Sequence, residues 1–260
     1  MAKLNIFIDG SWLFKACGKG SALSNRTEGA GPFRLDFERL CNALLAHAAR
    51  ANPNCTTIGE RYLSTSILDI PADVEDWIDG TTIFDEDIQA LRSSVHARDR
   101  FAQSALDANF DPSAIYRPKL RDWMLPKLRD RRFQEKLVDA TVVALLVRSA
   151  IVNAGDYHVV LTGDADVLPA IRVAYPKYSE NVFVATTHPD QLKSEARQSA
   201  FALHDFSSNV EPFYLDEHAA EFVDGDHVYT CSHCNKVFAR SAPIPARARP
   251  CCSPCHNSRT

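Results

Sequence analysis

The sequence predicts a doubly wound α/β domain, with a mostly parallel sheet flanked by helices, followed by a small zinc ribbon. Short apolar segments rich in β-forming residues alternate along the chain with longer segments of helical composition. This alternation is typical of parallel strands connected by helices. Two Cys-x-x-Cys pairs close to the C-terminus are typical of a zinc ribbon. We therefore expect an α/β domain over residues 1–223 and a zinc ribbon over residues 224–260.

Five strands and four helices are expected in the first domain. Leu4–Ile8 is an apolar run that ends in Asp9-Gly10, the pattern of a buried parallel strand followed by a turn. Asp85–Asn109 is the longest amphipathic segment, whereas Gln134–Asn153 is so apolar that we expect its helix to be packed on several sides. The other expected strands are Thr57–Ile67, Ile115–Arg117, Tyr157–Leu161 and Asn181–Ala185. The other expected helices are Phe37–Ala49 and Val167–Ala174.

Composition limits the class of protein to which the chain can belong. Its 260 residues are 45% hydrophobic, which is enough for a sizeable core. No apolar run approaches the roughly 18 residues of a membrane span, and no cationic leader precedes the first strand. We therefore expect a cytoplasmic protein without a membrane partner, in which Cys17, Cys41 and Cys55 are reduced and buried.

Positive charge is concentrated in two segments, although the net charge is −4. Eight basic residues stand against three acids from Arg117 to Lys136, and the last thirty residues hold five basic residues and no acid. Such segments favour a polyanionic partner, because Lys and Arg bind phosphates regardless of base sequence; the alternative is a solvated face. Tyr116 and Trp123 could stack on bases, although core packing is favoured for Trp123. The candidate nucleic-acid-binding residues are Arg117, Lys119, Arg121, Arg129, Arg131 and Arg132.

Three aspartates follow expected strands. Asp9 ends the first strand, and Asp164 and Asp166 follow the fourth. Ligands of an open parallel sheet bind beyond the carboxyl ends of its strands. Each residue alone would be interpreted as a helix N-cap, but clustered carboxylates repel each other unless a proton or a cation neutralises them. Mg²⁺ or Mn²⁺ suits such oxygen ligands.

A fourth aspartate, Asp139, stands near the start of the apolar helix, three residues after Lys136. An Asp in the first turn of a helix usually compensates the helix dipole. Here residues typical of a core flank it, so its side chain could point to the sheet edge where the other carboxylates are expected.

These motifs together resemble a known family. The strand before Asp9-Gly10, the Lys136-x-x-Asp139 start of an apolar helix and the turn Gly163–Asp166 resemble, in order and spacing, the NYN branch of the PIN-like nuclease superfamily. The resemblance covers Leu4–Leu215. It implies a Rossmann-like sheet and a metal-dependent phosphodiesterase, most often one that acts on RNA as an endoribonuclease.

If the chain hydrolyses phosphodiesters, each of the four aspartates and Lys136 has an expected role. Asp9 and Asp164 are the expected central ligands of Mg²⁺ or Mn²⁺, and the other two aspartates complete the shell directly or through water. Lys136 could bind a phosphate of the substrate. An ion pair between Lys136 and Asp139 on the same helix face is an equally good interpretation. Thr162 could orient a water or an aspartate. The expected catalytic residues are Asp9, Asp139, Asp164, Asp166 and Lys136.

Two positions depart from the family pattern and keep other functions open. Trp12 stands where the family commonly has Asn, and Leu145 stands where a further Asp often follows. A non-catalytic nucleic-acid-binding protein with a decayed site is one alternative, and a DNA-directed nuclease is another. A phosphatase of the haloacid dehalogenase type is disfavoured, because Ser11 replaces the Asp it needs two residues after Asp9. Asp205 is a further candidate acid of the site.

The two Cys-x-x-Cys pairs are separated by seventeen residues, a spacing that lets four sulfurs face one zinc ion. Cys251 competes with Cys252 for the third position, and His233 or His256 could substitute for a cysteine. The segment has few large apolar residues, so we expect it to need the metal in order to fold. The expected zinc ligands are Cys231, Cys234, Cys252 and Cys255.

The zinc ribbon is expected to bind either the substrate or a protein partner. Its lack of acids and its Arg240, Arg247 and Arg249 favour nucleic acid. RNA is favoured over DNA because of the family resemblance.

Overall fold

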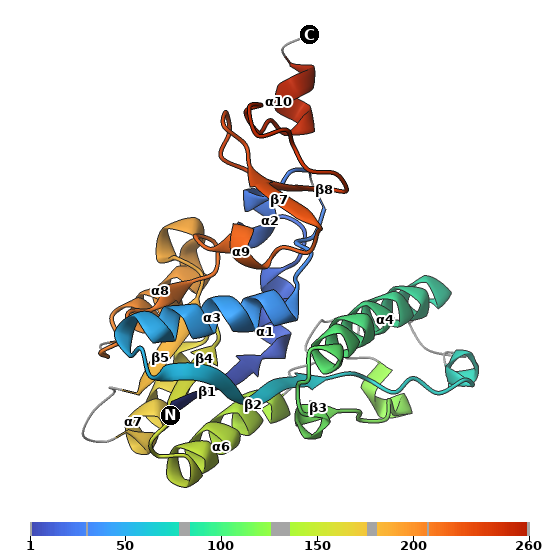
Figure 1. Cartoon of the computed structure of the whole chain (residues 1–260). Coiled ribbons are helices and arrows are strands. Elements are labelled where there is room, and N and C mark those ends of the chain that lie inside the picture. The colour runs from blue at the N-terminus through green and yellow to red at the C-terminus, as the bar shows by residue number, and fades with distance from the viewer. Residues whose placement is uncertain are drawn as a thin grey trace.

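The structure of the chain is a computed structural model, which describes residues 2–29, 31–77, 84–125, 136–175, 181–206 and 208–258. Its centre is a six-stranded sheet in the order β3-β2-β1-β4-β5-β6, with every neighbouring pair parallel (Figure 1). This is the order of a doubly wound sheet, which reverses its direction of growth between β1 and β4. The strands are β1 (Ala2–Asp9), β2 (Cys55–Ser66), β3 (Ile115–Tyr116), β4 (Tyr157–Leu161), β5 (Val182–Thr186) and β6 (Phe213–Tyr214).

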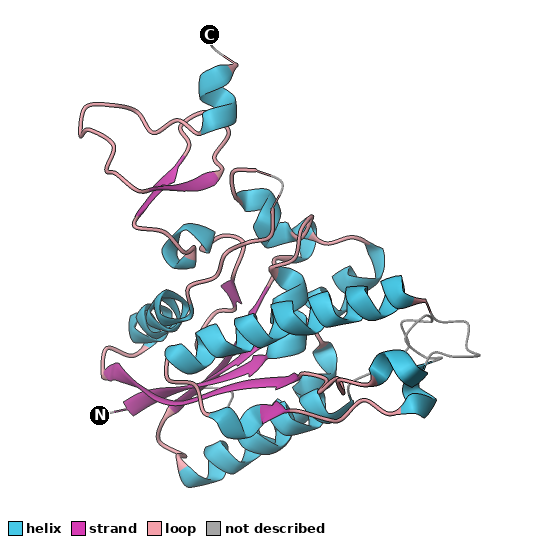
Figure 2. Cartoon of the chain, turned by 90° about the vertical axis from the view of Figure 1, so that its right-hand side faces the viewer, coloured by secondary structure: helices cyan, strands magenta, loops and turns pink. Residues whose placement is uncertain are grey.

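Helices cover both faces of the sheet (Figure 2), which confirms the predicted α/β architecture. Because side chains alternate between the faces along a strand, β1 sends Leu4, Ile6 and Ile8 into one core and Phe7 into the other. α3 packs on the first core, and α6 and α7 pack on the second. The helices of this part are α1 (Gly10–Ala16), α2 (Ala22–Arg26), α3 (Phe37–Ala51), α4 (Asp85–Asp107), α6 (Lys136–Val152), α7 (Leu168–Ala174), α8 (Ser194–His204) and α9 (Ala219–Phe222).

The structure differs from the sequence-based expectation in several places. The helices α1, α2, α8 and α9 have no counterpart among the expected helices. β6 adds a sixth strand, which pairs with β5 through Phe213 and Tyr214. α6 contacts β1, β2 and α7, but its two ends are exposed, since Leu137, Ile151 and Val152 are 55%, 75% and 72% exposed. Although α6 is apolar, none of the described helices combines the length and apolar character needed to cross a membrane.

The chain between β2 and α6 forms a lateral arm, defined here as residues 67–77 and 84–125. Val74, Ile88, Leu120 and Leu125 are buried together in a small core of this arm, and Figure 1 shows α4 extending away from the sheet. Trp123 lies on the arm and is 62% exposed, so the expectation that it packs in a core is wrong.

The C-terminal module is an antiparallel hairpin that packs on the segment between α2 and α3. Thr27 forms a parallel bridge with Val237, and the backbone N–H of Glu28 donates to the carbonyl of Val237 at 2.8 Å. The carboxylate of Glu28 accepts a hydrogen bond of 2.7 Å from the backbone N–H of Ser253, and Val237 is buried in the first core. The elements of the module are β7 (His227–Thr230), β8 (Val237–Arg240) and α10 (Ser253–Asn257).

Candidate functional site

Asp9 lies where β1 meets α1, and two hydrogen bonds hold its carboxylate. Oδ1 accepts a bond of 2.9 Å from the backbone N–H of Trp12, so Asp9 is the N-cap of α1. Oδ2 accepts a bond of 3.2 Å from Oγ1 of Thr162. Asp9 is only 7% exposed. Its carboxylate therefore both starts a helix and links the ends of β1 and β4.

The turn after β4 carries the next two aspartates. The backbone N–H of Asp164 donates to Oγ1 of Thr162 at 3.1 Å, and the backbone N–H of Asp166 donates to Oδ1 of Asp164 at 3.0 Å. Asp164 thereby caps the short 3-10 helix η4 (Ala165–Val167). A continuous chain of hydrogen bonds thus orients the turn relative to Asp9.

The four aspartates named from the sequence line one pocket at the carboxyl ends of β1 and β4. Asp9 is the buried member, whereas Asp139, Asp164 and Asp166 are exposed. Asp139 reaches the pocket from the first turn of α6. The pocket lies where the strand order of the sheet reverses, the position at which doubly wound sheets bind ligands. The other lining residues are Val142, Val143, Thr162 and Val167.

Electrostatic repulsion is built into this pocket. Burial raises the pKa of Asp9 above its ordinary value, and the charge of Asp139 raises it as well. The hydrogen bonds from Trp12 and Thr162 lower the pKa of Asp9, as does the charge of Lys15, but burial is the largest effect. A cation in the pocket would offset the repulsion between the carboxylates.

The donor atoms of the pocket fit a hard divalent cation. Its polar lining side chains are four carboxylates and one hydroxyl, and Mg²⁺ and Mn²⁺ prefer oxygen ligands. The cavity volume of about 40 Å³ exceeds the roughly 10–15 Å³ that one water needs. A second possible metal site, in which the side-chain ligand atoms all lie within 4.8 Å of one another, is formed by four C-terminal cysteines. Because Mg²⁺ usually keeps several waters, water would bridge to the ion any carboxylate that does not reach it directly.

Trp12 has a structural role at the site that the sequence patterns did not reveal. A Cβ on Gly163 would lie 1.9 Å from Nε1 of Trp12, so the indole occupies the space that any other side chain at this position would need. Trp12 is half-buried and packs against the first core. Trp12 therefore covers the turn that presents Asp164. In the sequence, only Gly163 indicated that another group packs closely against this turn, because glycine allows such close contact.

Three of the candidate phosphate-binding residues lie on the arm. Arg117 forms an ion pair of 2.6 Å with Asp99 of α4, and both side chains are about half exposed. Lys119 and Arg121 are exposed. Arg117 would have to share its guanidinium between Asp99 and a phosphate.

The other basic candidates cannot be placed in the same way. Arg129, Arg131 and Arg132 lie outside the described residues, and for Lys136 the structure describes only the backbone at the start of α6. Asp205 ends α8 and is not among the residues that line the aspartate pocket.

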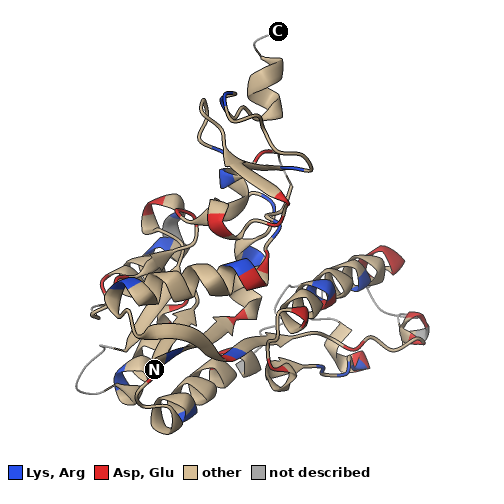
Figure 3. Cartoon of the chain, viewed as in Figure 1, with Lys and Arg blue, Asp and Glu red and all other residues tan. Residues whose placement is uncertain are grey.

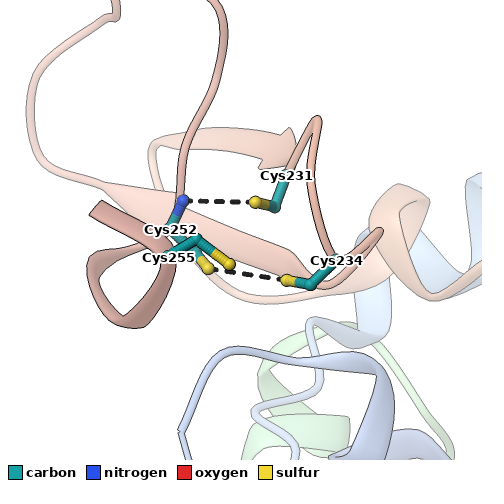
Figure 4. A group of neighbouring side chains, drawn as sticks. All are labelled: Cys231, Cys234, Cys252 and Cys255. Atoms are coloured by element: carbon teal, nitrogen blue, oxygen red, sulfur yellow. Dashed lines mark hydrogen bonds between the residues drawn. The ribbon is translucent and has the colours of Figure 1, made fainter. Parts of the chain in front are cut away.

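The four predicted zinc-ligand cysteines come together in the C-terminal module, although their two pairs are far apart in the sequence (Figure 4). Their sulfur atoms all lie within 4.8 Å of one another, and Cys231 and Cys252 are buried. Sγ of Cys234 lies 3.6 Å from Sγ of Cys252, which is too far for a disulfide. The adjacent Cys251 is outside the cluster, so Cys252 takes the third position. The four cysteines could bind a metal such as zinc.

The thiols of this cluster differ in their readiness to ionise. Backbone N–H groups of Cys252 and Cys234 lower the pKa of Cys231 to about 5. The neighbouring sulfurs, of which Cys252 and then Cys234 have the largest effects, raise the pKa of Cys255 to about 12. Several thiolates this close together repel each other, and a zinc ion removes that repulsion by binding them all.

The contact between Trp12 and Gly163 yields a first prediction. Gly163→Ala should lower the free energy of unfolding by about 1–3 kcal/mol, because the new methyl group would push a half-buried indole aside. Thermal unfolding measures this loss. Gly155→Ala is the matched control, because a Cβ there would meet nothing within 4 Å. The double change Trp12→Ala and Gly163→Ala should show less destabilisation than the sum of the two single changes. Equal stability of the Gly163 and Gly155 variants would contradict this packing.

The cysteine cluster yields a second prediction. Metal analysis should find about one zinc ion per chain, as one tetrahedral site requires. Changing Cys231 and Cys234 to Ser should remove the zinc, while Cys251→Ser, the matched control, should retain it. Loss of zinc should also speed hydrogen exchange at the backbone N–H of Glu28, because its acceptor is Val237 of the hairpin. Full zinc content in the Cys231/Cys234 variant would exclude these residues as ligands.

Comparisons of the chain with protein-family models, with curated proteins and with solved structures find no match. The assignment of a function therefore rests on the residues of the aspartate pocket and of the C-terminal module.

Proposed function

We propose that the chain is a metal-dependent endoribonuclease of the NYN/PIN-like type, which hydrolyses RNA phosphodiester bonds at the aspartate pocket. The supporting observation is that four carboxylates from three separate segments line one pocket at the reversal point of the sheet. Helix capping accounts for Asp9 and Asp164. It does not account for Asp139 and Asp166 beside them, because adding carboxylates to a partly buried site costs stability.

The residues of the pocket suit hydrolysis of a phosphodiester. A Mg²⁺ or Mn²⁺ ion bound there would neutralise phosphate oxygens and lower the pKa of an attacking water. The bonds from Trp12 and Thr162 fix Asp9 but leave it further acceptor sites, since a carboxylate has about four. Asp164 and Asp166 are exposed, so substrate and water can reach them.

The basic residues of the arm and of the segment before α6 would bind the substrate backbone. A hydrogen bond of 2.9 Å between the hydroxyls of Tyr116 in β3 and Thr141 in α6 joins the arm to the helix that carries Asp139. This bond would therefore hold Arg117 and Lys119 at a fixed position relative to the aspartate pocket. Phosphates bound by these two residues would be held there as well. The resemblance to NYN nucleases favours RNA, and a DNA-directed nuclease is the alternative that a cleavage assay with both substrates separates.

A non-catalytic nucleic-acid-binding protein is the second candidate, and Leu145 is the observation that favours it. Leu145 packs against the second core, so the position where the family often has another Asp serves packing here. The site then has four carboxylates at most. Mg²⁺- or Mn²⁺-dependent cleavage that EDTA abolishes would decide for the nuclease.

Cleavage by an Asp164 variant tests the proposed site. Asp164→Asn keeps the shape of the side chain but removes a charge, so we expect cleavage to fall by at least about 100-fold, since even outer-shell partners of a metal are worth about 10–100-fold. Excess Mn²⁺ should restore part of the rate. Asp111→Asn is the matched control, because Asp111 caps a 3-10 helix in the same way but lies outside the pocket. Wild-type rates for Asp164→Asn at every Mn²⁺ concentration would remove Asp164 from the site.

The raised pKa of Asp9 predicts a pH-dependent effect on stability. A carboxyl whose pKa is higher in the folded than in the unfolded state destabilises the fold when it is ionised. Asp9→Asn should therefore raise the melting temperature of metal-free protein at neutral pH, and the gain should disappear as the pH falls through the raised pKa. Asp36→Asn is the control, because Asp36 caps α3 in a similar way. A lower melting temperature for Asp9→Asn at neutral pH would show that capping outweighs repulsion.

A further inference from the structure

The C-terminal module carries a basic groove. Residues 227–258 contain four Lys or Arg and no Asp or Glu, and Figure 3 shows basic segments on the loops of this module. A groove of about 850 Å³, called the ribbon groove below, lies between β8, the loop 241–250 and α10. Arg240, Arg249 and His256 line it together with apolar residues of the loop, and its lining includes no acid.

Arg240 is held in place at the edge of this groove. Its guanidinium carbon lies 5.6 Å from the centre of the Phe238 ring, and its Nη2 donates to the carbonyl of Cys251 at 3.3 Å. Because a guanidinium has five N–H donors, others can meet a ligand. The loop opposite is fixed by a hydrogen bond of 2.8 Å from the backbone N–H of Ile244 to the hydroxyl of Tyr229. The groove is therefore formed before any ligand binds.

We propose that the ribbon groove binds single-stranded nucleic acid, with Arg240 and Arg249 contacting successive phosphates. This inference deepens the proposed nuclease function and takes from it the preference for RNA. The groove would extend the bound length of the substrate beyond the aspartate pocket. Four thiolates with one Zn²⁺ carry a charge of about −2, which the four basic side chains more than offset, so the module as a whole attracts a polyanion.

The lining of the groove favours an unpaired strand over a duplex. Pro243, Ile244 and Pro245 form an apolar stretch of the wall between the two arginines in sequence. An unpaired strand can turn its bases toward such a surface and toward a guanidinium plane while its phosphates meet the charges. The bases of a duplex are stacked inside the helix, so a duplex would leave the apolar residues without a partner.

Binding of labelled oligouridylate to the full-length, zinc-loaded chain tests this proposal. Fluorescence anisotropy would be measured over a range of salt concentrations without added Mg²⁺ or Mn²⁺, so that the result does not depend on cleavage. The variant Arg240→Ala/Arg249→Ala removes two charges inside the groove. Lys236→Ala/Arg247→Ala is the matched control, because it removes two charges from the same module at residues that are not part of the groove lining. Zinc content and melting temperature should be the same in all three proteins.

We expect the groove variant to bind RNA at least about tenfold more weakly, as the loss of charged hydrogen bonds implies. The slope of log K against log salt concentration should become shallower by about 1.4, since each phosphate contact on a single strand contributes about 0.7. Equal losses in the two variants, or no loss in either, would overturn the proposal. Competition by a duplex as strong as that by the single strand would also overturn it. Equally strong competition by a polyglutamate peptide would overturn it as well, because that result indicates a protein partner. Failure of the Asp164 test would refute the nuclease function without changing this binding result.

Discussion

The parallel pairing of β1 with β4 controls the geometry of the candidate site. Leu4 lies opposite Tyr157 and Ile8 lies opposite Leu161, so the two strands end at the same level. Asp9, which ends β1, and Thr162, which follows β4, can then form a hydrogen bond across a separation of 153 positions in the sequence. If one of the two strands slipped by one residue, its side chains would change faces and this bond would be lost.

Capping and ligand binding make opposite demands on the same carboxylates. As N-caps, Asp9 and Asp164 accept hydrogen bonds from backbone N–H groups, which stabilises their charged forms. Burial of Asp9 and the nearby charge of Asp139 favour the protonated form. The caps therefore fix the orientation of two carboxylates without neutralising the cluster. In the proposed nuclease, a cation would supply the missing charge, and both caps would also serve as its ligands.

The C-terminal module depends on the α/β part for packing and on its own cysteines for cohesion. Val237 of the hairpin is buried in the first core, whereas Cys231, Cys252 and Phe238 form a separate small core. The segment that receives the hairpin directly follows α2.

The sequence by itself determined the order of β1 to β5 and of α3, α4, α6 and α7, the strand ends that carry acids and the four clustered cysteines, because these depend on local periodicity and short spacing. It could not determine that α6 leaves Ile151 and Val152 exposed or that Trp123 lies at the surface, because an apolar residue becomes buried only where another element covers it. It did not reveal the two-residue β6 or the contact of Trp12 with Gly163. Only the tertiary structure decided that Asp9, Asp139, Asp164 and Asp166 line one pocket, since that requires the register of β1 against β4 and the position of α6 across the sheet.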